Sequence, residues 1–131
     1  MVEFALILPI FILLLTGMLD FGSGLYSRMT VINAAREGAR AAVTAADPAA
    51  VDTTVASAVA NAANGMSLNA SASCVAIATS PGPCNFGSGA GTLAQAGDAV
   101  DVRVDYTYHT FFPFLFGATF DVGTTVRMVL E

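Results

Sequence analysis

The pattern of hydrophobic and polar positions divides the chain into an oily N-terminal run and a longer, mixed remainder. Sixteen residues, Phe4 to Leu19, carry no charge, and Glu3 stands directly before them. As a helix this run would span about 24 Å, slightly less than the hydrocarbon core of a bilayer. We therefore expect an apolar helix that fits a membrane marginally and carries one acid at its tip.

The same helix is expected to continue well beyond the apolar run. Residues 28–46 are rich in alanine, arginine and glutamate, which are good helix formers. Asp47-Pro48 ends this pattern, because the residue before a proline disfavours helical backbone. We predict one helix from about residue 3 to residue 46, roughly 65 Å long. Its first half would protrude from the domain and find partners outside the monomer.

Breakers and small residues bear on the shape and packing of this helix. Pro9 removes a backbone donor, and three glycines between residues 17 and 24 weaken the helix. A kink or local unwinding and a straight helix both fit this pattern. Ala34, Gly38 and Ala42 form a row of small side chains at i, i+4 and i+8. Because such rows let another backbone approach closely, we assign these three residues to a subunit interface.

The remainder of the chain predicts a small α+β domain. Residues 48–64 suit a second helix docked on the first, and residues 66–79 suit a strand less clearly. Apolar and polar residues alternate over 100–108 and over 120–130, which indicates two strands with one buried face. Residues 111–116 are an aromatic connection between them. We predict an antiparallel sheet whose apolar face lies on the second half of the long helix.

Charge and chemistry exclude several classes of function. Residues 47–131 carry seven acids against Arg103 and Arg127, and the chain has no lysine. Nucleic-acid binding is therefore not expected. His109 is a lone histidine at a strand end, and we find no nucleophile–base set, metal-ligand cluster or phosphate-binding loop. We expect no enzyme activity, cofactor or metal.

The two cysteines, Cys74 and Cys84, flank residues 80–83, a Ser-Pro-Gly-Pro segment that must turn. A disulfide between them would close a short loop, stabilise the fold by about 2–4 kcal/mol and indicate an oxidising compartment. Two unpaired small core residues, or a metal-binding pair, are the alternatives. We predict the disulfide.

Motifs at both ends of the chain resemble one known family. The opening motifs are Val2-Glu3-Phe4-Ala5-Leu6, Pro9, Asp20-Phe21-Gly22 and Asn33-Ala34-Ala35-Arg36-Glu37-Gly38-Ala39-Arg40. The closing motifs are Gly97-Asp98-Ala99-Val100-Asp101-Val102, the valine–tyrosine strand, the proline loop, Arg127 and Glu131. Together they resemble the TadE-like branch of the type IV pilin superfamily, over nearly the whole chain.

The resemblance implies a type IV pilin-like fold of two parts. Residues 1–27 would be the apolar half-helix, held in the bacterial inner membrane and later in a filament core. Residues 28–131 would be the helix continuation and the globular α+β domain. Family members lose a short basic leader to a prepilin peptidase, and their acid is normally the fifth residue of the mature chain. Because Glu3 is the third residue here and the leader is absent, we expect either that one or two residues are missing or that the true mature start differs.

The resemblance also implies a function. The chain would be a structural subunit of an extracellular tight-adherence filament for surface attachment, a helical homo-oligomer built by the pilus assembly machinery. A minor, membrane-anchored pseudopilin that primes or assists pilus assembly is the alternative. A binding module for sugars or surface ligands, anchored by the helix, is a third hypothesis.

Glu3 has the strongest physical case among the predicted subunit-interface residues. A carboxylate among apolar helices is costly unless it is paired, and the resemblance implies the N-terminal amine of a neighbouring subunit as its partner. A position in the headgroup region, favoured by the helix dipole, is the alternative. The other predicted interface residues are Phe4, Leu8, Pro9, Phe11, Leu15, Asp20, Phe21, Ala34, Gly38 and Ala42.

Overall fold

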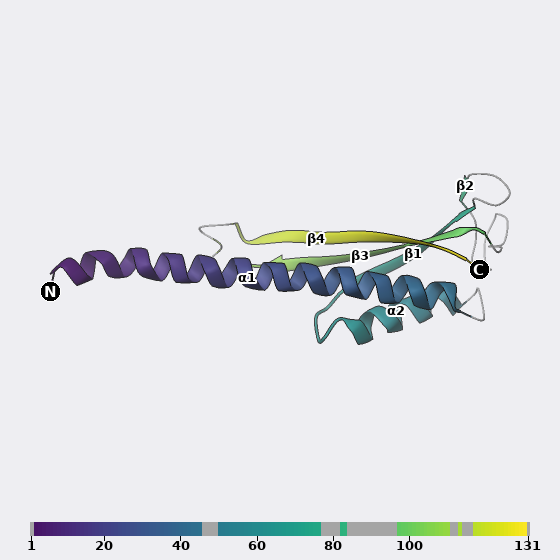
Figure 1. Ribbon diagram of the computed structural model, residues 1–131, viewed down its shortest axis with the longest axis horizontal. Coiled ribbons are helices and arrows are strands. Elements are labelled where there is room, and N and C mark those ends of the chain that lie inside the picture. The colour runs from purple at the N-terminus through teal and green to yellow at the C-terminus, as the bar shows by residue number, and fades with distance from the viewer. Residues whose placement is uncertain are drawn as a thin grey trace.

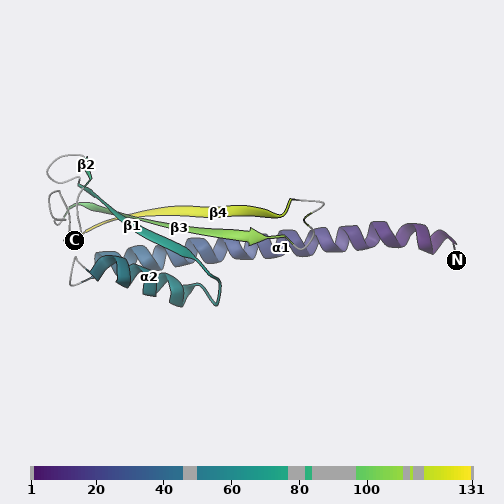
Figure 2. The same ribbon diagram turned by 180° about the vertical axis from the view of Figure 1, so that it is seen from behind.

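A long helix lies against a small antiparallel sheet, with a second helix beside it (Figures 1 and 2). The computed structural model describes residues 2–45, 50–76, 82–83, 97–110, 113 and 117–130. The elements are α1 (Val2–Val43), α2 (Val51–Ala62), β1 (Asn69–Ala76), β2 (Gly82–Pro83), β3 (Ala99–His109) and β4 (Thr119–Val129). The predicted α+β fold class, with a partly protruding apolar helix on a small sheet, is confirmed.

Helix α1 is one uninterrupted helix of 42 residues that includes Pro9 and all three glycines between residues 17 and 24. It is about 63 Å long. The local unwinding considered for residues 17–24 is therefore absent from this helix (Figure 1). The helix ends at Val43 rather than near residue 46. There the Thr44 hydroxyl donates to the Arg40 carbonyl at 3.0 Å, which satisfies one of the carbonyls at the helix end.

Helix α2 is shorter at both ends than the predicted range of 48–64. Its N-cap is Ala50, which has no capping side chain. At the C-terminal end Asn64 and Gly65 have φ values of 50° and 84°. This left-handed backbone stops the helix, as expected for a glycine after a helix. Val51, Val55 and Val59 are its buried residues.

The sheet has the strand order β2-β1-β3-β4, and every neighbouring pair is antiparallel. The strands predicted at 100–108 and 120–130 agree with β3 and β4 to within one residue at each end. Val100, Val102 and Val104 are fully buried on the face that α1 covers. The period-two pattern identified these strands because one face of the sheet is packed and the other is not.

The outward face of the sheet carries charged side chains instead. Arg127 donates two hydrogen bonds to Asp101, at 2.6 and 2.7 Å, and Arg103 pairs with Asp105 at 2.8 Å. The hydrogen bond from Arg127 holds the pKa of Asp101 below its ordinary value. This face is therefore a solvated, ion-paired surface, as the alternating sequence indicates.

The row of small residues on α1 lies inside the single chain. Ala34 and Ala42 are 0% and 1% exposed. A Cβ atom added to Gly38 would lie 2.7 Å from Val59 of α2 and 3.3 Å from Val102 of β3. The assignment of Ala34, Gly38 and Ala42 to a subunit interface is corrected by this position. Their small size lets α2 and the sheet approach α1 within one copy.

Two predictions from the sequence involve residues that the structure does not describe. Cys74 is buried near the end of β1, and Cys84 lies outside the described residues. The predicted disulfide therefore stays a prediction; the β1–β2 register, with Val75 opposite Pro83, is the register it needs. Of the aromatic segment 111–116, only Pro113 is described.

The far end of the domain is closed by backbone hydrogen bonds. The Leu130 amide donates to the Asp98 carbonyl at 2.7 Å, and the Gly97 amide donates to the Leu130 carbonyl at 2.8 Å. These bonds tie the end of β4 to the start of β3. The start of α1 lies at the opposite end of the molecule from the end of β4 (Figure 1).

Candidate assembly interface

The first half of α1 leaves large apolar side chains uncovered. Phe4, Phe11 and Phe21 are 71%, 55% and 70% exposed, and Leu8 and Leu15 are 41% and 46% exposed. This helix is long and apolar enough to cross a membrane, and its most apolar stretch of 18 residues is only 6% buried. A surface of this kind needs a partner or a lipid environment. It is the largest candidate site in the described part of the chain.

Glu3 lies in the first turn of α1, at the free tip of this surface. The positions three and four residues further along the helix are Leu6 and Ile7, both exposed. The helix dipole favours an acid in the first turn. Among the described residues Glu3 forms no ion pair. Glu3 and Pro9, both predicted interface residues, are exposed.

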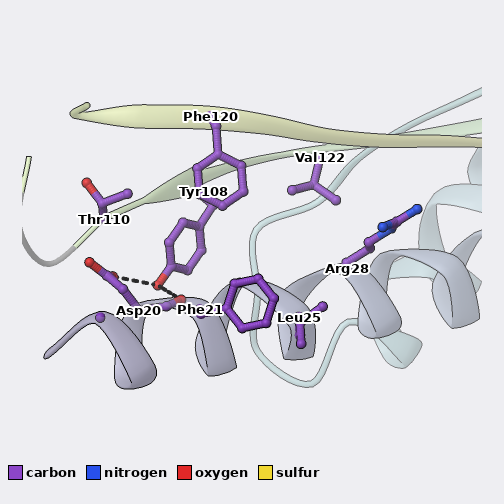
Figure 3. A pocket seen from close by; sticks show the side chains of 10 residues that line it. Asp20, Phe21, Leu25, Arg28, Tyr108, Thr110, Phe120 and Val122 are labelled. Carbon is purple, nitrogen blue, oxygen red and sulfur yellow. Dashed lines mark hydrogen bonds between the residues drawn. The ribbon is translucent and has the colours of Figure 1, made fainter. Parts of the chain in front are cut away.

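Asp20, another predicted interface residue, is buried within the chain. It is 7% exposed, and the Tyr108 hydroxyl of β3 donates to its Oδ1 atom at 3.2 Å (Figure 3). The Tyr108 hydroxyl also contacts the hydroxyl of Ser23. Phe120 of β4 packs on the Tyr108 ring with the two ring centres 4.8 Å apart. These contacts fasten α1 to the end of the sheet, so Asp20 is corrected from an interface residue to an internal anchor.

No sequence pattern indicated a role in a site for Tyr108. Its place in the alternating strand indicated only that it points toward the core. The signal that was available is Asp20 itself, because an acid next to an apolar run needs a hydrogen-bond donor once it is buried. Nothing in the sequence pattern indicates which of the distant donors it meets.

An apolar hollow of about 350 Å³ opens beside this anchor, between α1 and the ends of β3 and β4 (Figure 3). A Cβ atom on Gly24 would lie 3.3 Å from the Phe120 ring, so a glycine permits this close approach. The residues lining the hollow are Gly17, Asp20, Phe21, Gly24, Leu25, Arg28, Tyr108, Thr110, Phe120 and Val122. Its rim continues the exposed apolar surface of α1 toward Arg28.

The described residues contain no group of three or more His, Cys, Asp or Glu side chains that could hold a metal. The candidate site is thus an apolar surface with one acid at its tip, an internal Asp–Tyr anchor and one arginine where the surface meets the domain. Its chemistry is that of contact with lipid or with other helices. The fold and the site define a protein that displays an unburied apolar helix on a small α+β domain.

Comparison with known proteins agrees with this description. Residues 1–40 match the sequence model of a family described as TadE-like protein, as the resemblance predicted. The match contains the opening motifs. No curated protein and no solved structure matches the chain.

Proposed function

We propose that this protein is the structural subunit of a bacterial Tad-like filament, assembled by bundling the N-terminal halves of α1 from many copies. The observation that carries the proposal is the exposed apolar half-helix, from Phe4 to Leu19, attached to a domain that covers very little of it. The role is structural and non-enzymatic. The filament would serve attachment to surfaces.

The membrane and the helix bundle of the filament would differ in how closely they pack around this helix more than in their polarity. Burial of apolar area from water contributes about 25 cal/mol per Å², but a helix that leaves lipid is already in an apolar surrounding. Its transfer into a bundle is then favoured by closer packing and by compensation of polar groups. Glu3 is the polar group at issue, because it lies in the same exposed half-helix.

Before assembly, the proposal places the apolar half-helix in the inner membrane and the domain outside it. The helix has the length and composition for this position. A prepilin peptidase and the Tad assembly machinery would be its partners, and the finished homo-oligomer would lie on the cell surface. The TadE-like match at residues 1–40 supports the association with this machinery.

A minor role is the second candidate, and the description of the matched family supports it equally. The match is to TadE-like proteins, and a membrane-anchored pseudopilin that primes or assists assembly fits the same exposed helix. The two roles share the fold and the site. They differ in how many copies enter the fibre.

The amount of this chain in surface fibres separates the two roles. Fibres would be sheared from producing cells, imaged by electron microscopy and analysed by quantitative mass spectrometry. If the chain is a major subunit, it should be the principal protein of the fibres. If it is a minor subunit, it should be a small fraction of the fibre protein, and its deletion should still lower the number of fibres. Cells that lack the chain and make the same number of normal fibres would contradict both roles.

A further inference from the structure

Some charged residues of α1 form no ion pair with the described residues of their own copy. The charged residues of this helix are Glu3, Asp20, Arg28, Arg36, Glu37 and Arg40. Asp20 accepts the Tyr108 hydrogen bond. Glu37 and Arg40 are three residues apart, a spacing that brings side chains together on a helix surface. The two arginines of the sheet, Arg103 and Arg127, already pair with aspartates.

Arg28 is the arginine of α1 that lies nearest to the exposed apolar half of the helix. The positions three and four residues away on either side are Gly24, Leu25, Val31 and Ile32, so no acid of α1 faces it. The side chain is exposed and lies at the rim of the apolar hollow. In the described part of the chain Arg28 forms no ion pair. Glu3 has the same kind of surroundings, with Leu6 and Ile7 as neighbours.

We propose that Arg28 binds Glu3 of a second copy that is displaced along the helix axis. This inference rests on the proposed filament and deepens it by naming the partner of the acid. On one rigid helix the two residues are 25 positions apart, which is about 38 Å. They cannot meet within a copy, so the ion pair forms only between copies. An arginine can hold a carboxylate through two parallel hydrogen bonds, which gives the contact a defined geometry.

The position of Arg28 makes this surface continuous with the proposed interface. Exposed apolar side chains continue past the first run through Phe21, Leu25 and Met29, at 70%, 41% and 64% exposure. In a parallel copy offset in this way, the tip of the second helix lies beside Arg28, where this apolar surface ends. With 42 residues in α1, two parallel copies offset by about 38 Å still lie side by side over about 25 Å.

The proposed contact would define the axial offset between two neighbours. A contact of Glu3 with a neighbour's N-terminal amine requires an offset of only a few ångströms, whereas the Arg28 contact requires about 38 Å. In the parallel copies of the proposed filament, the pairing joins the tip of one helix to the middle of the other. Specificity of register is a well-attested use of a charge in an apolar contact.

A lysine substitution provides a direct test, because the chain has no lysine of its own. Arg28→Lys keeps the positive charge and introduces a single side-chain amine. Sheared fibres of this variant would be treated with a carbodiimide, which joins an amine and a carboxylate only when they are in contact. We expect a ladder of covalent oligomers on a denaturing gel, and mass spectrometry should find a peptide in which the introduced amine is joined to Glu3. The ladder should fall at least tenfold when Glu3→Gln is added.

Arg40→Lys is the matched control, because it places the amine on the same helix next to Glu37. This variant should yield no link to Glu3. Fibres of Arg28→Lys in which the introduced amine links only to other carboxylates, or to none, would overturn the inference while leaving the filament in place. Absence of the chain from wild-type fibres would instead overturn the filament itself.

Charge reversal supplies a second test that does not depend on the lysine variant. Arg28→Glu alone and Glu3→Arg alone should each lower the fibre yield at least tenfold, because each brings two like charges together. The double variant should recover most of the wild-type yield. A double variant no better than the worse single variant, or an Arg28→Glu variant with normal fibres, would overturn the inference.

Discussion

The two halves of α1 are parts of one continuous helix, yet side chains of the second half are buried within the domain and those of the first half are exposed. In the second half Ala34, Ala35 and Ala39 are completely buried against α2 and the sheet. In the first half the residues are large, and Phe4 and Leu6 are each 71% exposed. The small side chains of the second half pack within the chain, and the large side chains of the first half are left for contact with lipid or with another copy. Side-chain size thus separates internal contacts from external ones along this helix.

This difference indicates where each kind of substitution should act. A change in the first half should alter assembly and leave the domain folded. A change to a buried residue of the second half should destabilise the domain and affect assembly only as a result. Variants that reverse this assignment would show that the boundary between the halves is misplaced.

The largest effect is expected from a charge in the exposed half. Leu15→Asp places a carboxylate near the middle of the apolar run, which costs about 3 kcal/mol in each copy that enters a membrane. Fibre yield should fall by more than tenfold, as measured by sheared protein per cell. The melting temperature of the domain should not change. Thr125→Asp, on the outward face of β4, is the control that should alter neither; normal fibres from Leu15→Asp would place the assembly surface elsewhere.

A methyl group in the buried half should have the next largest effect. Gly38→Ala puts a Cβ atom 2.7 Å from Val59, and overpacking of this kind costs about 1–3 kcal/mol. Thermal unfolding of the detergent-solubilised chain, followed by circular dichroism, should show a lower melting temperature. Gly22→Ala is the matched control, because nothing lies within 4 Å of its Cβ position. If both variants melt alike, the close approach at Gly38 is not what holds α2 in place.

The anchor between the two halves should respond more weakly. Tyr108→Phe removes the hydroxyl that donates to Asp20, and loss of such a buried hydrogen bond costs about 1–2 kcal/mol. The melting temperature should fall, and amide hydrogen exchange near Asp20 should become faster. Tyr26→Phe, at an exposed position of α1, should change neither measurement. Unchanged exchange at Asp20 would mean that ring packing, and not the hydroxyl, fastens the helix.

The smallest effect is expected on the outward face, far from both halves. The pKa of Asp101 is held down by the hydrogen bond from Arg127, so the pair stabilises the folded chain above the ordinary aspartate pKa of about 3.9. That stabilisation is lost as the pH falls through the lowered pKa of the folded state. Arg127→Gln should therefore melt slightly below the wild type at pH 7, and the difference should vanish in strong acid. A difference that grows in acid would contradict this sign.

The sheet and helix classes could be predicted from the sequence because their periodicities are strong. The alternation from Val100 to Tyr108 defines a buried face directly, and β3 extends only one residue beyond it at each end. The uncharged run after Glu3 likewise indicated an apolar helix without reference to any partner. In both cases the physical cause, burial of one face or of one segment, is local in sequence.

The placement of individual site residues was harder, for reasons that two cases illustrate. The row of Ala34, Gly38 and Ala42 shows that another backbone comes close, but the pattern does not say whether that backbone belongs to the same chain. Asp20 was predicted to be an interface residue, whereas its donor, Tyr108, belongs to the same chain and is 88 residues away. Long-range pairing of this kind leaves no periodic signal.

The separation of the chain's two described ends has a consequence for any stack of parallel copies. One end is an oily helix tip, and the other is a polar sheet end closed by the bonds between Leu130 and Asp98. Unlike ends in repeated head-to-tail contact do not close into a ring unless the rotation happens to return to its start. A stack would then grow at one end only. New subunits would join at the end that displays the apolar helix tips. A tag placed after β4 in the first subunits would lie at the opposite end of the finished stack.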